Sequence, residues 1–141
     1  MAAVAAKGIL ISVDSLAQLE MFGQLCPGGR VCVRLNTGVG AGHHAKVVTG
    51  GHETKFAIDP TLYGEMRKIL KKYDLKLVGI NQHIGSLFME PDNYLNAIEF
   101  LLHFVQSDLA DLLPGIEIID FGGGLGIPYR KYEEEPRLDM A

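Results

Sequence analysis

Apolar and polar positions along the chain follow two alternating periods, which predict strands followed by helices. Short segments rich in apolar residues, at 9–13, 31–35, 75–80 and 116–120, are typical of buried strands. Residues 56–58 could add a further short strand. Apolar residues at helical spacing follow the first run, and the same spacing returns in two later segments. Strands that alternate with helices indicate βαβ units, so the predicted fold class is α/β with a parallel sheet.

Three predicted helices have recognisable starts. Asp14-Ser15 caps the first, Asp59-Pro60 caps the second, and Pro91 opens the third. The second helix is expected to bury one apolar face, made of Leu62, Met66, Ile69 and Leu70. The third has a broad stripe, expected to pack mainly into the core, made of Tyr94, Leu95, Ile98, Leu101, Leu102 and Val105.

Composition narrows the class of protein. The chain has 141 residues, 48% hydrophobic and 21% charged, which is ordinary for a soluble globular domain. Its net charge of −4 argues against nucleic acid or an anionic membrane as the main partner. Cys26 and Cys32 have no companion pair, so neither a zinc site nor a disulfide framework is indicated. A reducing, cytoplasmic setting is therefore expected, and no apolar run reaches membrane-spanning length.

The residues of chemical interest follow the ends of predicted strands. They form three groups, at residues 34–36, 83–86 and 122–126. Both α/β barrels and doubly wound sheets place ligands at that edge. Four of the five residues in 122–126 are glycines, and backbone N–H groups can grip an anion only where no Cβ blocks close approach. Residues 36–55, with five glycines and no apolar period, are predicted to form a functional loop.

Two common phosphate motifs are absent. The dinucleotide fingerprint Gly-x-Gly-x-x-Gly fails in both glycine-rich stretches, because His43 and Ile127 occupy the last glycine position. The Gly-Lys-Ser/Thr of a phosphate-binding loop does not occur. A kinase or a dehydrogenase would therefore rest on fold alone, which is weak evidence for function.

Ordered motifs along nearly the whole chain resemble the diaminopimelate decarboxylases, within the fold-type III enzymes that use pyridoxal phosphate (PLP). They are RLNTGVG at residues 34–40, GHH at 42–44, VTGG at 48–51, TKF at 54–56, HIGS at 83–86 and DFGGGLGIPY at 120–129. The histidine-containing loop and the Ile-Pro-Tyr ending favour diaminopimelate over the ornithine and arginine relatives. The implied fold is about half of a PLP-binding (β/α)8 barrel.

The resemblance implies a set of cofactor-binding positions. The residue matching His83 stacks on the pyridine ring, and the one matching Arg34 lies near the cofactor's 3′ oxygen. Those matching Ser86, Gly122, Gly123 and Gly124 hold the phosphate. Lys55 matches a lysine near the dimer interface. Taken singly, each has an ordinary alternative: Arg34 an ion pair, His83 a core histidine, and Ser86 a helix cap.

The chain also departs from the family pattern. The family usually has glycine where this sequence has Ala57. The lysine that joins the cofactor is expected upstream of Ile9, and Lys7 lacks its surrounding motif. Glu135-Pro136-Arg137 is not the family's Glu-Pro-Gly-Arg segment. We therefore expect residues 1–141 to be the central part of a barrel domain, without a catalytic residue, the lysine-bearing strands or the C-terminal β-domain.

The implied function of the full-length enzyme is decarboxylation of meso-diaminopimelate to L-lysine by a homodimer that uses PLP. Residues 1–141 alone are expected to be inactive, and no metal site is expected. Two alternatives stay open. One is another fold-type III decarboxylase, acting on ornithine, arginine or carboxynorspermidine. The other is a non-catalytic truncated product.

Overall fold

A computed structural model describes residues 1–38, 56–86, 88 and 91–126. Within these ranges, strands and helices alternate as the sequence predicts. The strands are β1 (Ile11–Val13), β2 (Arg30–Arg34), β3 (Lys76–Asn81) and β4 (Ile118–Asp120). The α-helices are α1 (Ala2–Ala5), α2 (Leu16–Leu25), α3 (Tyr63–Lys72) and α4 (Asp92–Ser107). Two short 3-10 helices, η2 (Pro60–Leu62) and η3 (Leu113–Gly115), precede α3 and β4.

The described strands form one parallel sheet in the order β1-β2-β3-β4. Each strand pairs with the next one along the chain, and the order never reverses. A doubly wound sheet reverses its order at the ligand crevice, whereas a (β/α)8 barrel adds its strands in sequence. The topology is therefore that of one half of a barrel, with β1 and β4 at the two edges of the described sheet.

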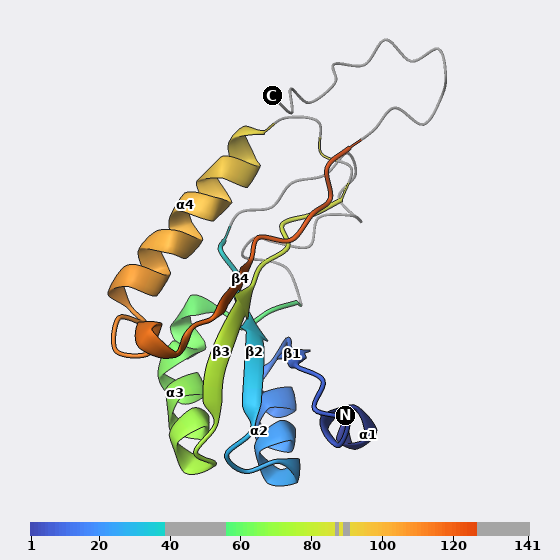
Figure 1. Ribbon diagram of the computed structural model, residues 1–141. Coiled ribbons are helices and arrows are strands. Elements are labelled where there is room, and N and C mark those ends of the chain that lie inside the picture. The colour runs from blue at the N-terminus through green and yellow to red at the C-terminus, as the bar shows by residue number, and fades with distance from the viewer. Residues whose placement is uncertain (39–55, 87, 89–90, 127–141) are drawn as a thin grey trace.

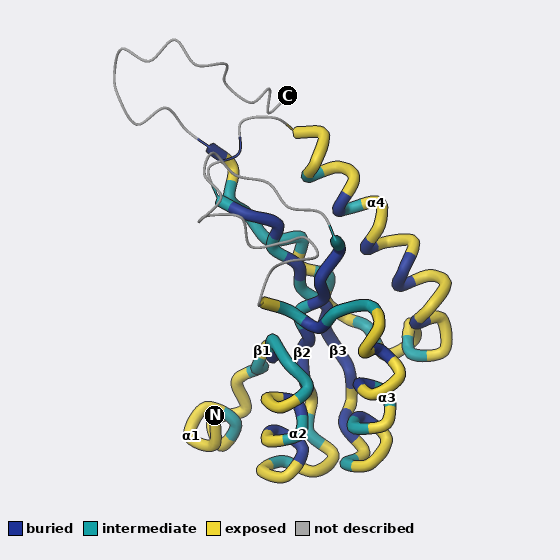
Figure 2. Tube along the Cα trace, turned by 180° about the vertical axis from the view of Figure 1, so that it is seen from behind, coloured by how far each residue is buried: buried dark blue, intermediate teal, exposed yellow. Residues whose placement is uncertain are grey.

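Helices α2, α3 and α4 all cover the same face of this sheet (Figure 1). Viewed from behind, the buried parts of α2 and α3 face the strands (Figure 2). The main core lies between these layers and contains Val13, Val33 and Ile80 from the strands. Its helical side chains are Leu19 and Phe22 from α2, Met66 and Leu70 from α3, and Leu101, Phe104 and Val105 from α4.

The capping predictions are confirmed. The Ser15 side chain accepts from the N–H group of Gln18 at 3.3 Å, and Asp59 Oδ1 accepts from that of Thr61 at 2.9 Å. Asp59 caps η2, which runs into α3 and leaves Leu62 exposed. The expectation that Leu62 belongs to the buried face of this helix is therefore wrong.

The apolar stripe expected on α4 is only partly buried. Leu101 and Val105 are in the core, but Leu95 and Leu102 are 53% and 37% exposed. Ala97 and Phe104 are buried in addition. The helix packs on the main core through positions 101, 104 and 105, and Ala97 packs against Ile84 and Phe88 beyond β3, so its buried face is narrower than the periodicity indicated.

Strand boundaries also differ at some ends. Ile9, expected inside the first strand, is 54% exposed and precedes β1. Ile116 lies before β4 rather than within it. The possible strand at residues 56–58 is a single bridge between Leu35 and Ile58. Residues 39–55, most of the predicted functional loop and Lys55 with it, lie outside the described residues.

Ala57 adopts a backbone conformation that favours glycine. Its φ is 74°, in the left-handed region where a Cβ costs about 1–2 kcal/mol. Replacing Ala57 by glycine is therefore expected to raise the free energy of unfolding by about 0.5–1 kcal/mol, since the relieved strain exceeds the added chain entropy. Urea unfolding measures the change. Ala17→Gly, in the exposed part of α2, is the control and should lower stability; a loss of stability in both variants would contradict the prediction.

Candidate functional site

A polar row crosses the sheet where the strands end. Arg34, Asn81 and Asp120 are the last residues of β2, β3 and β4, and they are Cα partners in the strand register. Asp14, the residue after β1, lies beside Arg34, with 3.8 Å between its Oδ1 and the Arg34 Nη1. The carboxyl edge of the described sheet is therefore charged and hydrogen-bonded, in contrast to the apolar face beneath α2 and α3.

Arg34 contributes a positive charge to this row, and its side chain is fixed by its contacts. Its side chain is only 14% exposed, and its Nη2 donates to the carbonyl of His83 at 3.1 Å. The guanidinium lies 5.5 Å from the ring centroid of Phe56. Its Nε is buried and has no hydrogen-bond partner among the described residues. A fixed cation with a spare donor suits an anionic or phenolate-like oxygen.

His83 lies two residues beyond β3 and contacts the glycine loop. Its Nδ1 accepts from the backbone N–H of Gly123 at 3.4 Å, which assigns the proton of the neutral ring to Nε2. Burial lowers the pKa of His83 below its ordinary value. The Arg34 guanidinium lowers this pKa further, and the Asp120 carboxylate partly opposes both. The imidazole is therefore uncharged at neutral pH and presents a flat, neutral face.

The three predicted glycines have different structural requirements. Gly122 and Gly124 have φ of +74° and +97°, which L side chains rarely adopt. A Cβ on Gly122 would overlap the carbonyl oxygen of Gln82, and one on Gly124 would overlap that of Gly85. Gly123 has neither constraint from the described residues, since none of their atoms lies within 4 Å of the place its Cβ would take. The fold thus needs Gly122 and Gly124, while the space at Gly123 is open.

Hydrogen bonds join the glycine loop to the segment after β3. The N–H of Phe88 donates to Gly124 O at 3.1 Å, and the N–H of Gly126 donates to Phe88 O at 2.8 Å. The Tyr94 hydroxyl of α4 donates to Gly122 O at 3.4 Å. Ser86 also lies beside the glycine loop, because a Cβ on Gly124 would be 3.2 Å from the Cα of Ser86.

The structure therefore brings all six predicted positions together: Arg34, His83, Ser86, Gly122, Gly123 and Gly124. Sequence reasoning gave no part in the site to Asp14, Asn81, Asp120 or Tyr94, which support them. The first three were detectable as polar residues at strand ends, the same signal that singled out Arg34. Tyr94 was assigned to the core stripe. Residues 127–129, the Ile-Pro-Tyr end of the glycine motif, lie outside the described residues.

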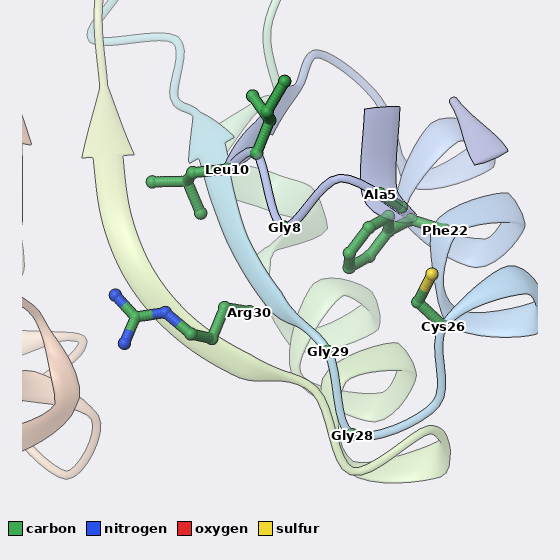
Figure 3. Close-up of a pocket in the computed structure, with 9 residues that line it drawn as sticks. Ala5, Gly8, Leu10, Phe22, Cys26, Gly28, Gly29 and Arg30 are labelled. Carbon is green, nitrogen blue, oxygen red and sulfur yellow. The ribbon is translucent and has the colours of Figure 1, made fainter. Parts of the chain in front are cut away.

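A cavity of about 480 Å³ lies at the other, amino end of the sheet (Figure 3). It is bordered by Phe22 of α2, by Cys26, which follows that helix, and by the first residue of β2, Arg30, whose side chain points across β3. None of the six predicted residues lines it. Within the described ranges, no group of three or more His, Cys, Asp or Glu side chains could hold a metal ion.

The model of the family described as "Pyridoxal-dependent decarboxylase, pyridoxal binding domain" matches residues 1–140. The chain belongs to this family. Pyridoxal phosphate is thus the cofactor indicated for the domain, and the half-barrel topology agrees with it. The predicted fold class and cofactor are confirmed.

Two curated relatives carry the same name. The diaminopimelate decarboxylase of Methanothermobacter thermautotrophicus is 39% identical over 135 residues, which cover 95% of this chain and 31% of the relative. The diaminopimelate decarboxylase of Escherichia coli K12 is 33% identical over 126 residues, covering 89% of this chain and 29% of the relative. The chain thus spans about a third of the length of the curated relatives that it matches.

Solved structures of related decarboxylases superpose on this chain. The diaminopimelate decarboxylase of Helicobacter pylori, complexed with L-lysine, superposes with a TM-score of 0.77 at 28% identity, over 94% of this chain and 35% of that one. The Paramecium bursaria Chlorella virus arginine decarboxylase gives a TM-score of 0.68 at 22% identity, over 91% of this chain and 33% of that one. The second likeness shows the shared fold alone.

The described residues fit pyridoxal phosphate. The guanidinium of Arg34 has a buried Nε without a partner among them, and Gly123 leaves a Cβ-sized space beside the His83 ring. A cation, a flat neutral ring and an open glycine are what an anionic, aromatic cofactor requires. No helix in the described part of the chain is long and apolar enough to cross a membrane.

Proposed function

We propose that this chain forms the cofactor cradle of a diaminopimelate decarboxylase. The observation that carries the proposal is the contact between the loops that follow β3 and β4. The N–H of Gly123 donates to the His83 ring, and Arg34 donates to the His83 carbonyl. These residues lie at the end of β2 and just beyond β3 and β4, so only the folded half-barrel assembles them. The name shared by the two curated relatives supports the same assignment.

Each residue receives a role from its chemistry. His83 stacks its neutral imidazole on the pyridine ring, a contact that contributes about 0.5–1.5 kcal/mol beyond burial. Arg34 directs its guanidinium to the 3′ oxygen. Ser86 and the glycine loop hold the phosphate. Because the N–H groups of Gly122 and Gly123 already donate to Asp120 and His83, Gly122 contributes chiefly its turn, and Gly123 contributes the open space through which the phosphate reaches the backbone at Gly124.

The reaction that we assign is decarboxylation of meso-diaminopimelate to L-lysine, within a longer enzyme in which residues 1–141 supply the central part of the barrel. Bound pyridoxal phosphate supplies the electron sink that this chemistry needs. The share of each relative outside the match, about two thirds, supports assigning the remaining catalytic groups to other segments. Homodimeric assembly and a cytoplasmic location are part of the proposal and follow from the family resemblance.

Segment exchange tests this function. Residues 1–141 replace the matching segment either of the Methanothermobacter diaminopimelate decarboxylase or of the viral arginine decarboxylase. We expect the first hybrid to bind PLP and release carbon dioxide from meso-diaminopimelate. The second should release little from arginine, because its packing partners differ at 22% identity. Carbon dioxide release is measured for each hybrid with its own substrate.

Two controls accompany the hybrids. The unmodified parent enzymes give the reference rates, and Arg34→Ala in the first hybrid should lower its PLP affinity. A well-folded first hybrid that neither binds PLP nor releases carbon dioxide would overturn the proposed function. So would an active second hybrid beside an inactive first one.

A further inference from the structure

Asp120, the last residue of β4, makes two contacts in different directions. Its Oδ2 accepts from Asn81 Nδ2 at 2.9 Å, across to the neighbouring strand. Its Oδ1 accepts from the N–H of Gly122 at 2.8 Å, forward into the glycine loop. The backbone of Asp120 is also held, because its carbonyl accepts from the N–H of Gln82 at 2.9 Å, immediately before the turn at Gly122.

These contacts determine the direction in which the loop leaves the sheet. With Gly122 held at a φ of +74°, the next N–H, that of Gly123, is directed at Nδ1 of His83. The carboxylate of Asp120 thus has two partners: the side chain of Asn81 and the backbone N–H of the turn at Gly122. A chain of hydrogen bonds therefore runs from β3 through Asp120 to the glycine loop and back to the ring beyond β3.

We propose that Asp120 is the positioning residue of this site: its carboxylate fixes the turn at Gly122 and thereby holds Gly123 in register with the His83 ring. The inference rests on the proposed function in assigning that register to the cofactor. The charged groups that act on the His83 ring show that Asp120 lies close enough to it for this role. Arg34 from β2 and Asp120 from β4 act on the imidazole in opposite senses, and Asp14 from the end of β1 is paired with Arg34.

A purely structural role for Asp120 makes a different prediction. If the carboxylate only tied β4 to Asn81, its loss would lower the free energy of unfolding and leave the His83 proton on Nε2. If the carboxylate positions the loop, its loss also changes which nitrogen of the His83 ring carries the proton. The ¹⁵N chemical shifts of the imidazole report which nitrogen carries the proton, and a change in stability alone does not alter them.

The experiment compares variants of the 141-residue chain labelled with ¹⁵N-histidine, with the His83 signals assigned through His83→Gln. The wild type should show an unprotonated Nδ1 at neutral pH. Asp120→Asn should keep this state, since an amide oxygen can still accept from Gly122 while the Asn81 amide turns over. Asp120→Ala should show mixed tautomers. Glu117→Gln is the matched control, because it removes an acid at the opposite end of β4 that pairs with Arg30 at 2.9 Å.

A second measurement concerns the phosphate. Pyridoxamine 5′-phosphate and pyridoxamine, which cannot react with lysines, are titrated in parallel. The preference for the phosphorylated probe should fall about tenfold in Asp120→Ala and stay at the wild-type value in Asp120→Asn and Glu117→Gln. If Asp120→Ala does not fold, Asp120→Glu decides, since it keeps the charge and moves the carboxylate; we expect mixed tautomers there as well.

An unchanged His83 tautomer and an unchanged probe preference in a folded Asp120→Ala or Asp120→Glu variant would overturn the positioning role. Failure of the wild type to bind either probe would instead count against the proposed function. In that case the tautomer still tests Asp120, so the two failures can be told apart.

Discussion

Replacing Gly124 by alanine is expected to lower the free energy of unfolding by about 2–5 kcal/mol, the sum of left-handed backbone strain and steric overlap. Gly124 has a φ of +97°, and an added Cβ would overlap the carbonyl oxygen of Gly85. The overlapping atoms belong to the backbone of Gly85 and Ser86, in the segment that is hydrogen-bonded to the glycine loop at Phe88. The overlap therefore cannot be relieved by turning a side chain.

Chemical denaturation of the cofactor-free chain measures this loss. Gly123→Ala is the matched control, one residue away, and should unfold within about 0.5 kcal/mol of the wild type because its Cβ meets no atom of the described residues. Equal stabilities for the two variants would show that the close approach of the two loops does not persist in solution.

Replacing Gly123 by valine should have the opposite profile, with little change in folding and a severe loss of cofactor affinity. In the hybrid with the Methanothermobacter enzyme, we expect PLP to bind roughly a hundredfold more weakly, as when a charged group loses its hydrogen bonds. A branched side chain would fill the space beside the His83 ring where the phosphate approaches the backbone. The cofactor-free melting temperature should stay near that of the unsubstituted hybrid.

His83→Ala gives the comparison for this second result. Loss of a ring stack should weaken PLP binding by about tenfold, less than the loss in Gly123→Val. Equilibrium titration of PLP measures both. If both variants bind PLP as the unsubstituted hybrid does, the assignment of these residues to the cofactor fails.

The order of strands and helices was predictable because it depends on local periodicity. Apolar runs marked the strands, and Ser15 and Asp59 marked the helix starts. The face that α4 buries was not predictable in detail. Leu95 and Leu102 have the same hydrophobicity as Leu101, and their exposure depends on which elements pack against the helix.

The candidate site divides in the same way. The resemblance named Gly122, Gly123 and Gly124 as one group, since nothing in the sequence separates three consecutive glycines. Their different requirements arise from Gln82 and Gly85, which are distant in the chain and meet the loop only in the folded sheet. The two contacts of Asp120 are equally non-local, because one of them crosses to β3.

The bridge between Phe88 and Leu125 continues the pairing of β3 and β4 beyond the sheet. Bringing β3 and β4 together costs chain entropy only once, and the same pairing orders both the sheet and the cofactor cradle. Local opening of the cradle is thereby linked to separation of the two strands, so the site should exchange its amide protons as part of the sheet. A ligand that enters such a preordered site immobilises few additional residues, which makes the entropy of its binding less unfavourable.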